Sequence, residues 1–221
     1  MADIFEEVDE DLRRDSAAAL WAKYQNLVYG AVALVILGTA GVTGWQIYDR
    51  NAREKAGIEY LQALQRADQD PKAAGDVLGT LIHEGGPFAG LARFDLVHQA
   101  IKAGDKAGAL AQLSAMAGDA KLEAPLKGAA ALMGGYVALD LGKADAALAL
   151  ATPLTGDGQP YRLSAAEITG LAAYASGDKT KAKEIFTKLD EELKKAAEAG
   201  TTSVPANLQN RVSIMLDRLA G

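Results

Sequence analysis

Side chains that could perform acid–base or metal chemistry are few in this sequence, and they are scattered. The two histidines, His83 and His98, lie far apart in different expected helices, whereas a zinc site needs about three protein ligands with ordered spacing. Asp95 and His98 share a helix face at positions i and i+3 and could form an acid–base pair. We expect instead an ordinary surface or packing pair, for which the same spacing is typical.

Motifs for other kinds of catalysis and for cofactor binding are absent. The sequence has no H-E-x-x-H motif, no glycine-rich phosphate loop and no nucleophile elbow. Gly156-Asp157-Gly158 matches a fragment of a calcium loop, without the other ligands at alternate positions. The absence of cysteine excludes disulfides, thiolate catalysis and zinc–thiolate sites. We expect no catalytic, cofactor-binding or metal-binding residues and no cofactor; a hydrolase or metal-dependent enzyme is the distant alternative.

Composition narrows the possible ligands and the fold class. The formal net charge of the 221 residues is −6, so no basic surface is available to neutralise the phosphates of a nucleic acid. We expect neither a nucleic acid nor a small-molecule substrate. Alanine and glycine are abundant while aromatic residues make up 6%, which favours closely packed helices over a β-sandwich.

An uncharged stretch of 25 residues, 24–48, dominates the N-terminal part of the chain. As a helix it would be about 37 Å long, more than the roughly 30 Å hydrocarbon core of a bilayer. An acidic segment precedes it and no small-residue cleavage site follows, so a signal peptide does not fit. The sequence predicts a single uncleaved transmembrane helix rather than a buried hairpin. Aromatic residues favoured at membrane interfaces lie near its two ends: Tyr24, Tyr29, Trp45 and Tyr48.

Small residues recur within this predicted anchor at spacings near three, four and seven. They would form one face on which another helix could pack closely, although glycine and alanine are common in membrane helices anyway. The residues of this small face, which we predict to bind a membrane partner, are Gly30, Ala33, Ala40, Gly41 and Gly44.

Residues 1–23 form an acidic tail whose role and location the sequence leaves open. The tail could be disordered, or it could dock to a partner as a short helix through Ile4, Phe5 and Val8. The positive-inside rule does not orient the anchor, because three basic residues flank it on each side. These are Arg13, Arg14 and Lys23 before it, and Arg50, Arg53 and Lys55 after it.

Residues 49–221 contain an internal repeat. Four similar turns begin at Gln69, Gly104, Gly142 and Gly177, at steps of 35, 38 and 35 residues. Five places after each start stands an alanine, in the small packing position of the repeat motif: Ala74, Ala109, Ala147 and Ala182. Four places later comes the larger apolar packing position: Leu78, Leu113, Ala151 and Phe186. A helix–turn–helix unit with a period near 34 residues is the tetratricopeptide signature. We therefore predict an all-α fold: one N-terminal transmembrane helix, then an α-solenoid of degenerate tetratricopeptide-like helix pairs.

Three further features of the repeat domain can be predicted. Ile58, Leu61 and Leu64 would form one apolar face of a helical stalk that continues from the anchor. A last amphipathic helix, at about 204–219, would cap the array. The concave face would be lined by the first helix of each pair, and the candidate partner-binding residues there are Arg93, Gln99, Tyr136 and Tyr174.

The whole chain resembles the YfgM-like family of ancillary subunits of the bacterial SecYEG translocon. The likeness rests on the order of tail, anchor ending in Gly44-Trp45, stalk and repeats, and on segments 87–94, 104–106 and 144–148. It implies a single-pass inner-membrane protein with a cytoplasmic N-terminus and a periplasmic repeat domain. Its implied partners are translocon subunits and periplasmic chaperones or newly exported polypeptides. The alternative is a general scaffold for envelope assembly or cell division.

Overall fold

The computed structural model describes residues 3–198, 205 and 207–221, with side chains described at 18 and from 20 onward within these ranges. No strand occurs in this part of the chain, so the prediction of an all-α fold is confirmed. The elements are α1 (Asp3–Arg66), α2 (Pro71–Glu84), α3 (Ala89–Lys102), α4 (Lys106–Gly118), α5 (Ala124–Asp140), α6 (Ala144–Ala151), the 3-10 turn η1 (Thr152–Leu154), α7 (Arg162–Ala175), α8 (Lys179–Glu198) and α9 (Leu208–Ala220).

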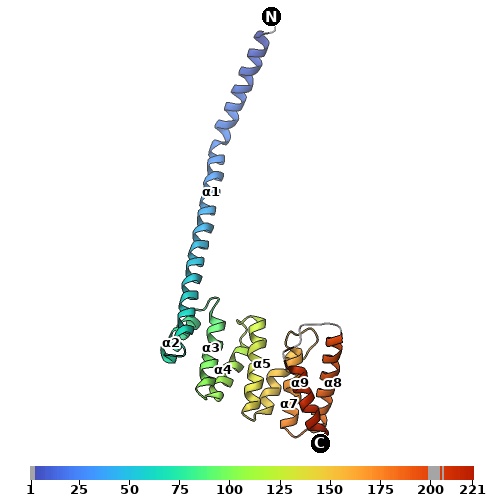
Figure 1. The fold of residues 1–221 in the computed structure, drawn as a ribbon. Helices are drawn as coiled ribbons and strands as arrows, with labels where there is room; N and C mark the ends of the chain where they lie inside the picture. Colours follow the sequence, from blue (N-terminus) through green and yellow to red (C-terminus); the bar gives the residue numbers. More distant parts are fainter. Residues whose placement is uncertain (1–2, 199–204, 206) are drawn as a thin grey trace. The chain divides into compact units, whose positions relative to one another are not determined.

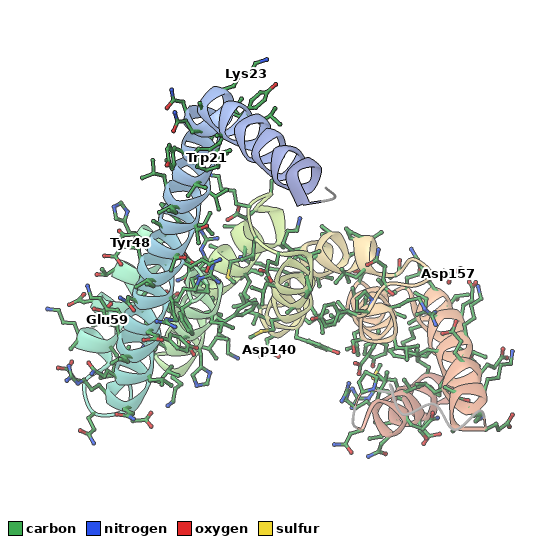
Figure 2. The ribbon with its side chains drawn as sticks, turned by 90° about the horizontal axis from the view of Figure 1, so that it is seen from above. Trp21, Lys23, Tyr48, Glu59, Asp140 and Asp157 are labelled. Atoms are coloured by element: carbon green, nitrogen blue, oxygen red, sulfur yellow. The ribbon has the colours of Figure 1, made fainter. Side chains whose placement is uncertain are left out.

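The chain divides into two units, residues 1–55 and residues 56–221. The first unit is the N-terminal part of α1, which begins at Asp3, so the backbone of the acidic tail is helical. Large apolar side chains between residues 20 and 48 are exposed, and Figure 2 shows Trp21 and Tyr48 projecting from the helix. Within the described residues, α1 is the one helix long and apolar enough to cross a membrane. The side chains of Ile4, Phe5 and Val8 lie outside the described residues, as do residues 199–204 and 206.

The second unit is a succession of antiparallel helix pairs. In Figure 1 helices α2, α3, α4, α5, α7 and α8 follow one another along the array in chain order, and α9 lies beside α7 and α8. The end of α1 packs on α2 and α3 in one apolar cluster. Helix α3 pairs with α4, α5 with α6, and α7 with α8, and from α2 onward each helix also packs against the next in the chain. This is the solenoid that the period near 34 residues predicts.

The four repeated turns lie before the second helix of each pair, and their chemistry explains the helix starts. The glycines at three of them have φ of +84° (Gly104), +67° (Gly142) and +85° (Gly177), a conformation that costs glycine little. The next residue is the N-cap. Asp70, Asp105 and Asp178 each accept a hydrogen bond from a backbone N–H of the first turn, at 2.8–3.0 Å. Lys143 occupies the fourth N-cap position and makes no such bond.

The two predicted packing slots of the second helices are filled as the repeat requires. The small slot is fully buried at every repeat: Ala74, Ala109, Ala147 and Ala182. The larger slot is also fully buried: Leu78, Leu113, Ala151 and Phe186. A Cβ at Gly170 would lie 2.9 Å from the slot residue Phe186, and one at Gly135 of α5 would lie 3.0 Å from Ile168 of α7, the first helix of the next pair. Glycine is therefore needed at both positions for the helices to approach.

The apolar face expected on the stalk points away from the array. Ile58, Leu61 and Leu64 are 57%, 58% and 38% exposed. The face that α1 packs on α2 and α3 is made instead by Ala56, Tyr60 and Ala63. Small residues let the neighbouring helices come close, and the Tyr60 ring stacks on Phe88 with centroids 5.3 Å apart. Close approach, rather than side-chain size, determines which face of α1 is buried.

The last helix covers the apolar face of the final pair. Leu208, Val212 and Met215 of α9 are buried against Phe186, Leu189 and Leu193 of α8. Without α9 these α8 side chains would be open to water on that side, since no further repeat follows among the described residues.

Replacing Gly170 by alanine tests the close approach of α7 and α8. The new methyl group would meet the buried Phe186 ring, so we expect Gly170→Ala to lower the free energy of unfolding by about 1–3 kcal/mol. Gly79→Ala is the matched control, because its Cβ meets nothing within 4 Å on α2, and it should raise stability by up to about 1 kcal/mol. Chemical unfolding of the full chain in nanodiscs, followed by circular dichroism, measures both; equal effects would contradict the close approach.

Candidate interaction surfaces

Arg93, the first of the candidate partner-binding residues, is engaged within its own repeat. From α3 its Nη1 lies 2.6 Å from Oδ2 of Asp119, the residue that ends α4. The hydrogen bond from Arg93 and one from the backbone N–H of Lys121 hold the pKa of Asp119 below its usual value. The Arg93 side chain is 34% exposed. Its guanidinium links α3 to the end of α4 and is therefore already ion-paired within the repeat domain.

Tyr136 belongs to a network that links three helices. Its hydroxyl, on α5, donates a hydrogen bond of 2.6 Å to Oε2 of Glu167 on α7. Arg211, on α9, contacts the same carboxylate in a bidentate manner, with Nε 2.6 Å from Oε1 and Nη2 2.8 Å from Oε2. Burial and the hydrogen bond to Glu167 raise the pKa of Tyr136 above its usual value.

Glu167 is the buried charge of the array, with 2% of its surface exposed. A buried carboxylate is costly unless its oxygens are hydrogen-bonded and its charge is paired. Tyr136 and Arg211 meet both conditions. The sequence gives no sign of this residue, because a glutamate in a helix is ordinarily exposed.

The other two candidate lining residues lie at different interfaces. Gln99, on α3, faces Gly75 of α2, and its buried Nε2 has no hydrogen-bond partner among the described residues. Tyr174, on α7, is half-buried against the apolar cluster of α8 and α9. Arg93, Gln99, Tyr136 and Tyr174 are thus distributed over three repeats, and their contacts do not bring them together into one site.

The small face of the predicted anchor is open. Ala33 and Ala40 are exposed, and a Cβ built at Gly30, Gly41 or Gly44 meets nothing within 4 Å. The first unit thus leaves these five positions available to another helix.

The residues considered for catalysis are separated. His83, on α2, and His98, on α3, are both exposed. Asp95 accepts a hydrogen bond of 2.7 Å from the Tyr60 hydroxyl, and this bond, with burial as the larger cause, raises the pKa of Tyr60 to about 12. Within the described residues, no three His, Asp or Glu side chains are placed to hold a metal ion.

A groove that the sequence analysis did not identify lies between consecutive second helices. It has a volume of about 520 Å³; α4 and α6 form its walls, and α5 forms its floor, with Tyr161 closing one end. Its surface is mainly apolar, from small side chains such as Ala117, Ala131 and Ala149 and from Pro153 and Leu154. We call this the α4–α6 groove. One side chain in its lining is charged, that of Lys127.

The preceding pair of second helices forms an equivalent hollow. It has a volume of about 440 Å³, lies between α2 and α4, and is lined by the ion-paired Arg93 and Asp119. Shifting by the 38-residue step between the turns places Ala131 at the position of Arg93 and Asp157 at that of Asp119. The alignment of the repeats therefore indicates where the groove is open, because Ala131 stands where the preceding repeat has Arg93.

Comparison with known proteins identifies the fold family. The family model for the tetratricopeptide repeat-like domain matches residues 19–220. No curated protein and no solved structure matches this chain. The matched region includes the apolar part of α1 as well as the repeats, so one family describes both.

Removing Arg211 tests the network around Glu167. Arg211→Ala leaves the buried carboxylate unpaired, and we expect the free energy of unfolding to fall by up to about 3 kcal/mol; the loss is limited because Arg211 is 43% exposed. Adding Glu167→Gln should recover part of this loss, since it removes the unpaired charge. The control Lys188→Ala breaks an exposed pair with Glu184 and should cost less than about 1 kcal/mol. Equal losses for Arg211→Ala and Lys188→Ala would contradict the role of the network.

Proposed function

Because the chain belongs to the tetratricopeptide repeat-like domain family, we propose that it is a membrane-anchored protein–protein interaction scaffold that acts as an ancillary subunit of the Sec translocon. The family match over residues 19–220 carries this proposal, because the family's fold is typical of non-enzymatic scaffolds that bind proteins. One helix long and apolar enough to cross a membrane precedes the array, which supports an anchored rather than a freely diffusing scaffold.

The proposed division of labour follows the chain. Residues 1–23 are the cytoplasmic tail, 24–48 the transmembrane helix, and 49–221 the periplasmic repeat domain, with a capping helix at about 204–219. The small face (Gly30, Ala33, Ala40, Gly41 and Gly44) packs on a translocon subunit, since it is open and small residues permit close helix contact in membranes. The repeat domain binds periplasmic chaperones or newly exported polypeptides. The likeness to YfgM-like subunits supports the inner-membrane location and this orientation.

Enlarging the small face tests the proposed docking to the translocon. Gly41→Leu with Gly44→Leu adds bulk to that face, and we expect SecYEG subunits to be lost from affinity purifications in mild detergent. Val35→Leu with Val42→Leu adds bulk on the other side of the helix, at 100° per residue, and should leave the complex intact. Translocon subunits absent from the wild-type purification, with envelope proteins bound equally by both variants, would indicate a general envelope scaffold instead.

A single cysteine tests the proposed orientation, because the chain has none of its own. Ser176 is exposed on the turn before α8, so Ser176→Cys should not disturb the array. We expect a membrane-impermeant maleimide to label it once the outer membrane is opened. Labelling only after the inner membrane is lysed would place the repeat domain in the cytoplasm.

A further inference from the structure

We propose that the α4–α6 groove is a docking site for an acidic–apolar peptide segment, whose apolar side chains lie on the α5 floor and whose carboxylate binds Lys127. This inference rests on the proposed function as a protein-binding scaffold and names the partner chemistry of one surface. The family match assigns no role to this groove. The groove lies between second helices and is therefore distinct from the expected concave face, which the first helices line.

The shape and surface of the groove suit an apolar side chain. Its volume of about 520 Å³ lies within the roughly 300–1,000 Å³ of typical ligand sites. The floor includes Ala131 and Gly128, against which the Tyr161 ring packs, and the walls carry Leu150 and Leu154. Each large apolar side chain buried there gains about 1.5–3 kcal/mol.

The neighbouring repeats show what the rim of such a groove binds. In the preceding repeat, Arg93 of the first helix binds Asp119 at 2.6 Å. In the following repeat, Arg162 of the first helix binds Glu192 at 2.8 Å. In both, a cation on the first helix holds a carboxylate of the same helix pair, which is the C-cap of α4 in one repeat and a residue within α8 in the other.

The middle repeat has the two charges of the following repeat without the ion pair, whereas Ala131 occupies the position of the preceding repeat's Arg93. Shifting by 35 residues places Lys127 at the position of Arg162 and Asp157 at that of Glu192. Among the described residues, neither Lys127 nor Asp157 has an ion pair or a side-chain hydrogen bond. Asp157 lies on the turn before α7 (Figure 2), outside the lining of the groove. Lys127 is therefore available to a carboxylate from another molecule, in the role that Glu192 has for Arg162.

Two further features favour a peptide with an acidic residue. Lys127 lies in the first turn of the 17-residue helix α5, where the helix dipole favours an anion, although the carboxylate of the N-cap residue Glu123 opposes it. The side chains of Ser114 and Gln159 line the groove without a hydrogen-bond partner among the described residues. They can pair with the peptide backbone, which an acyl chain would not satisfy.

Binding of defined peptides to the full chain in phosphatidylcholine nanodiscs tests the proposal. Fluorescein-labelled GSGLFEGSG should bind saturably, whereas GSGAAEGSG should bind at least about tenfold more weakly because its apolar side chains are missing. GSGLFQGSG should bind about three- to fivefold more weakly than the Glu peptide, the value of one partly exposed charge pair. Fluorescence anisotropy gives the dissociation constants, with empty nanodiscs as the blank.

Substitution of Lys127 assigns the charge contact. Lys127→Ala should remove the preference for the Glu peptide over the Gln peptide, and Lys127→Glu should make GSGLFKGSG the better ligand. The matched control, Lys143→Ala, removes an exposed lysine outside the groove and should retain the preference. A preference for Glu that survives in Lys127→Ala would overturn the proposal.

Substitutions that fill the groove with a long side chain test whether the apolar side chains of the peptide bind there. Ala131→Arg places an arginine on the groove floor, at the position that Arg93 has in the preceding repeat, so it should abolish binding while leaving the helical signal unchanged. Ala149→Arg, at an exposed position of the groove wall, serves the same purpose if Ala131→Arg unfolds. Ala111→Arg, exposed on α4 outside the groove, is the control.

Three outcomes would each overturn the inference. The first is no saturable binding up to about 1 mM, the weak limit of specific recognition; the second is displacement of the peptide by laurate, which would indicate an acyl ligand. The third is a dimeric mass that Ala149→Arg reduces to a monomer, which would place a second copy in the groove. If translocon subunits still co-purify with the wild type, only this inference fails; if they do not, the proposed function fails separately.

Discussion

The structure depends on the close approach of the two helices in each pair. Helices whose contact positions carry only small side chains can pack at about 8 Å between axes, and the fully buried Ala74, Ala109, Ala147 and Ala182 provide that position in every repeat. Gly170 allows the Phe186 ring to lie against α7. Because these contact positions carry small residues, each helix pair contains few large apolar side chains. An isolated helix pair would therefore have only a small hydrophobic core. Stability must come from contacts between neighbouring layers and from the covering of the array's end.

The end of the array is positioned by a charge as well as by apolar contacts. Leu208, Val212 and Met215 bury the face of α8, but apolar contact alone is non-directional. The bidentate contact of Arg211 with Glu167 adds direction, because it fixes the rotation of α9 about its axis. Glu167 also accepts a hydrogen bond from the Tyr136 hydroxyl. Displacement of α9 would leave the buried carboxylate with this hydrogen bond but without its ion pair. Helices α5, α7 and α9 are thus coupled through one side chain.

The sequence was sufficient to predict the fold class, the repeat and the residues of its packing slots, because period and side-chain size determine them directly. It was insufficient where two far-separated residues must meet. Tyr136 was chosen for an aromatic ring on a first helix, yet the position of its hydroxyl depends on Glu167, 31 residues away. The stalk illustrates a second limit: Ile58 and Leu61 have the expected spacing but lie on the exposed face, since Ala63 permits a closer contact with α2. The α4–α6 groove is defined by a missing side chain, which only comparison between repeats can reveal.

Repetition lets the grooves change while the core stays constant. Arg93–Asp119 lines the hollow between α2 and α4, and Arg162–Glu192 joins α7 to α8; both pairs are made by partly exposed side chains. The small slots of the repeats are filled by fully buried alanines, which carry no charge. The middle repeat therefore keeps its packing without such an ion pair, and Lys127 lies beside an open apolar floor. A shallow groove with one charge binds a short segment weakly on its own. The proposed membrane anchor would change that arithmetic, because a client held at the same membrane site would be presented at an effective concentration of about 1 mM. Under that proposal weak recognition by the groove is enough, and it permits release of the client when the membrane partner departs.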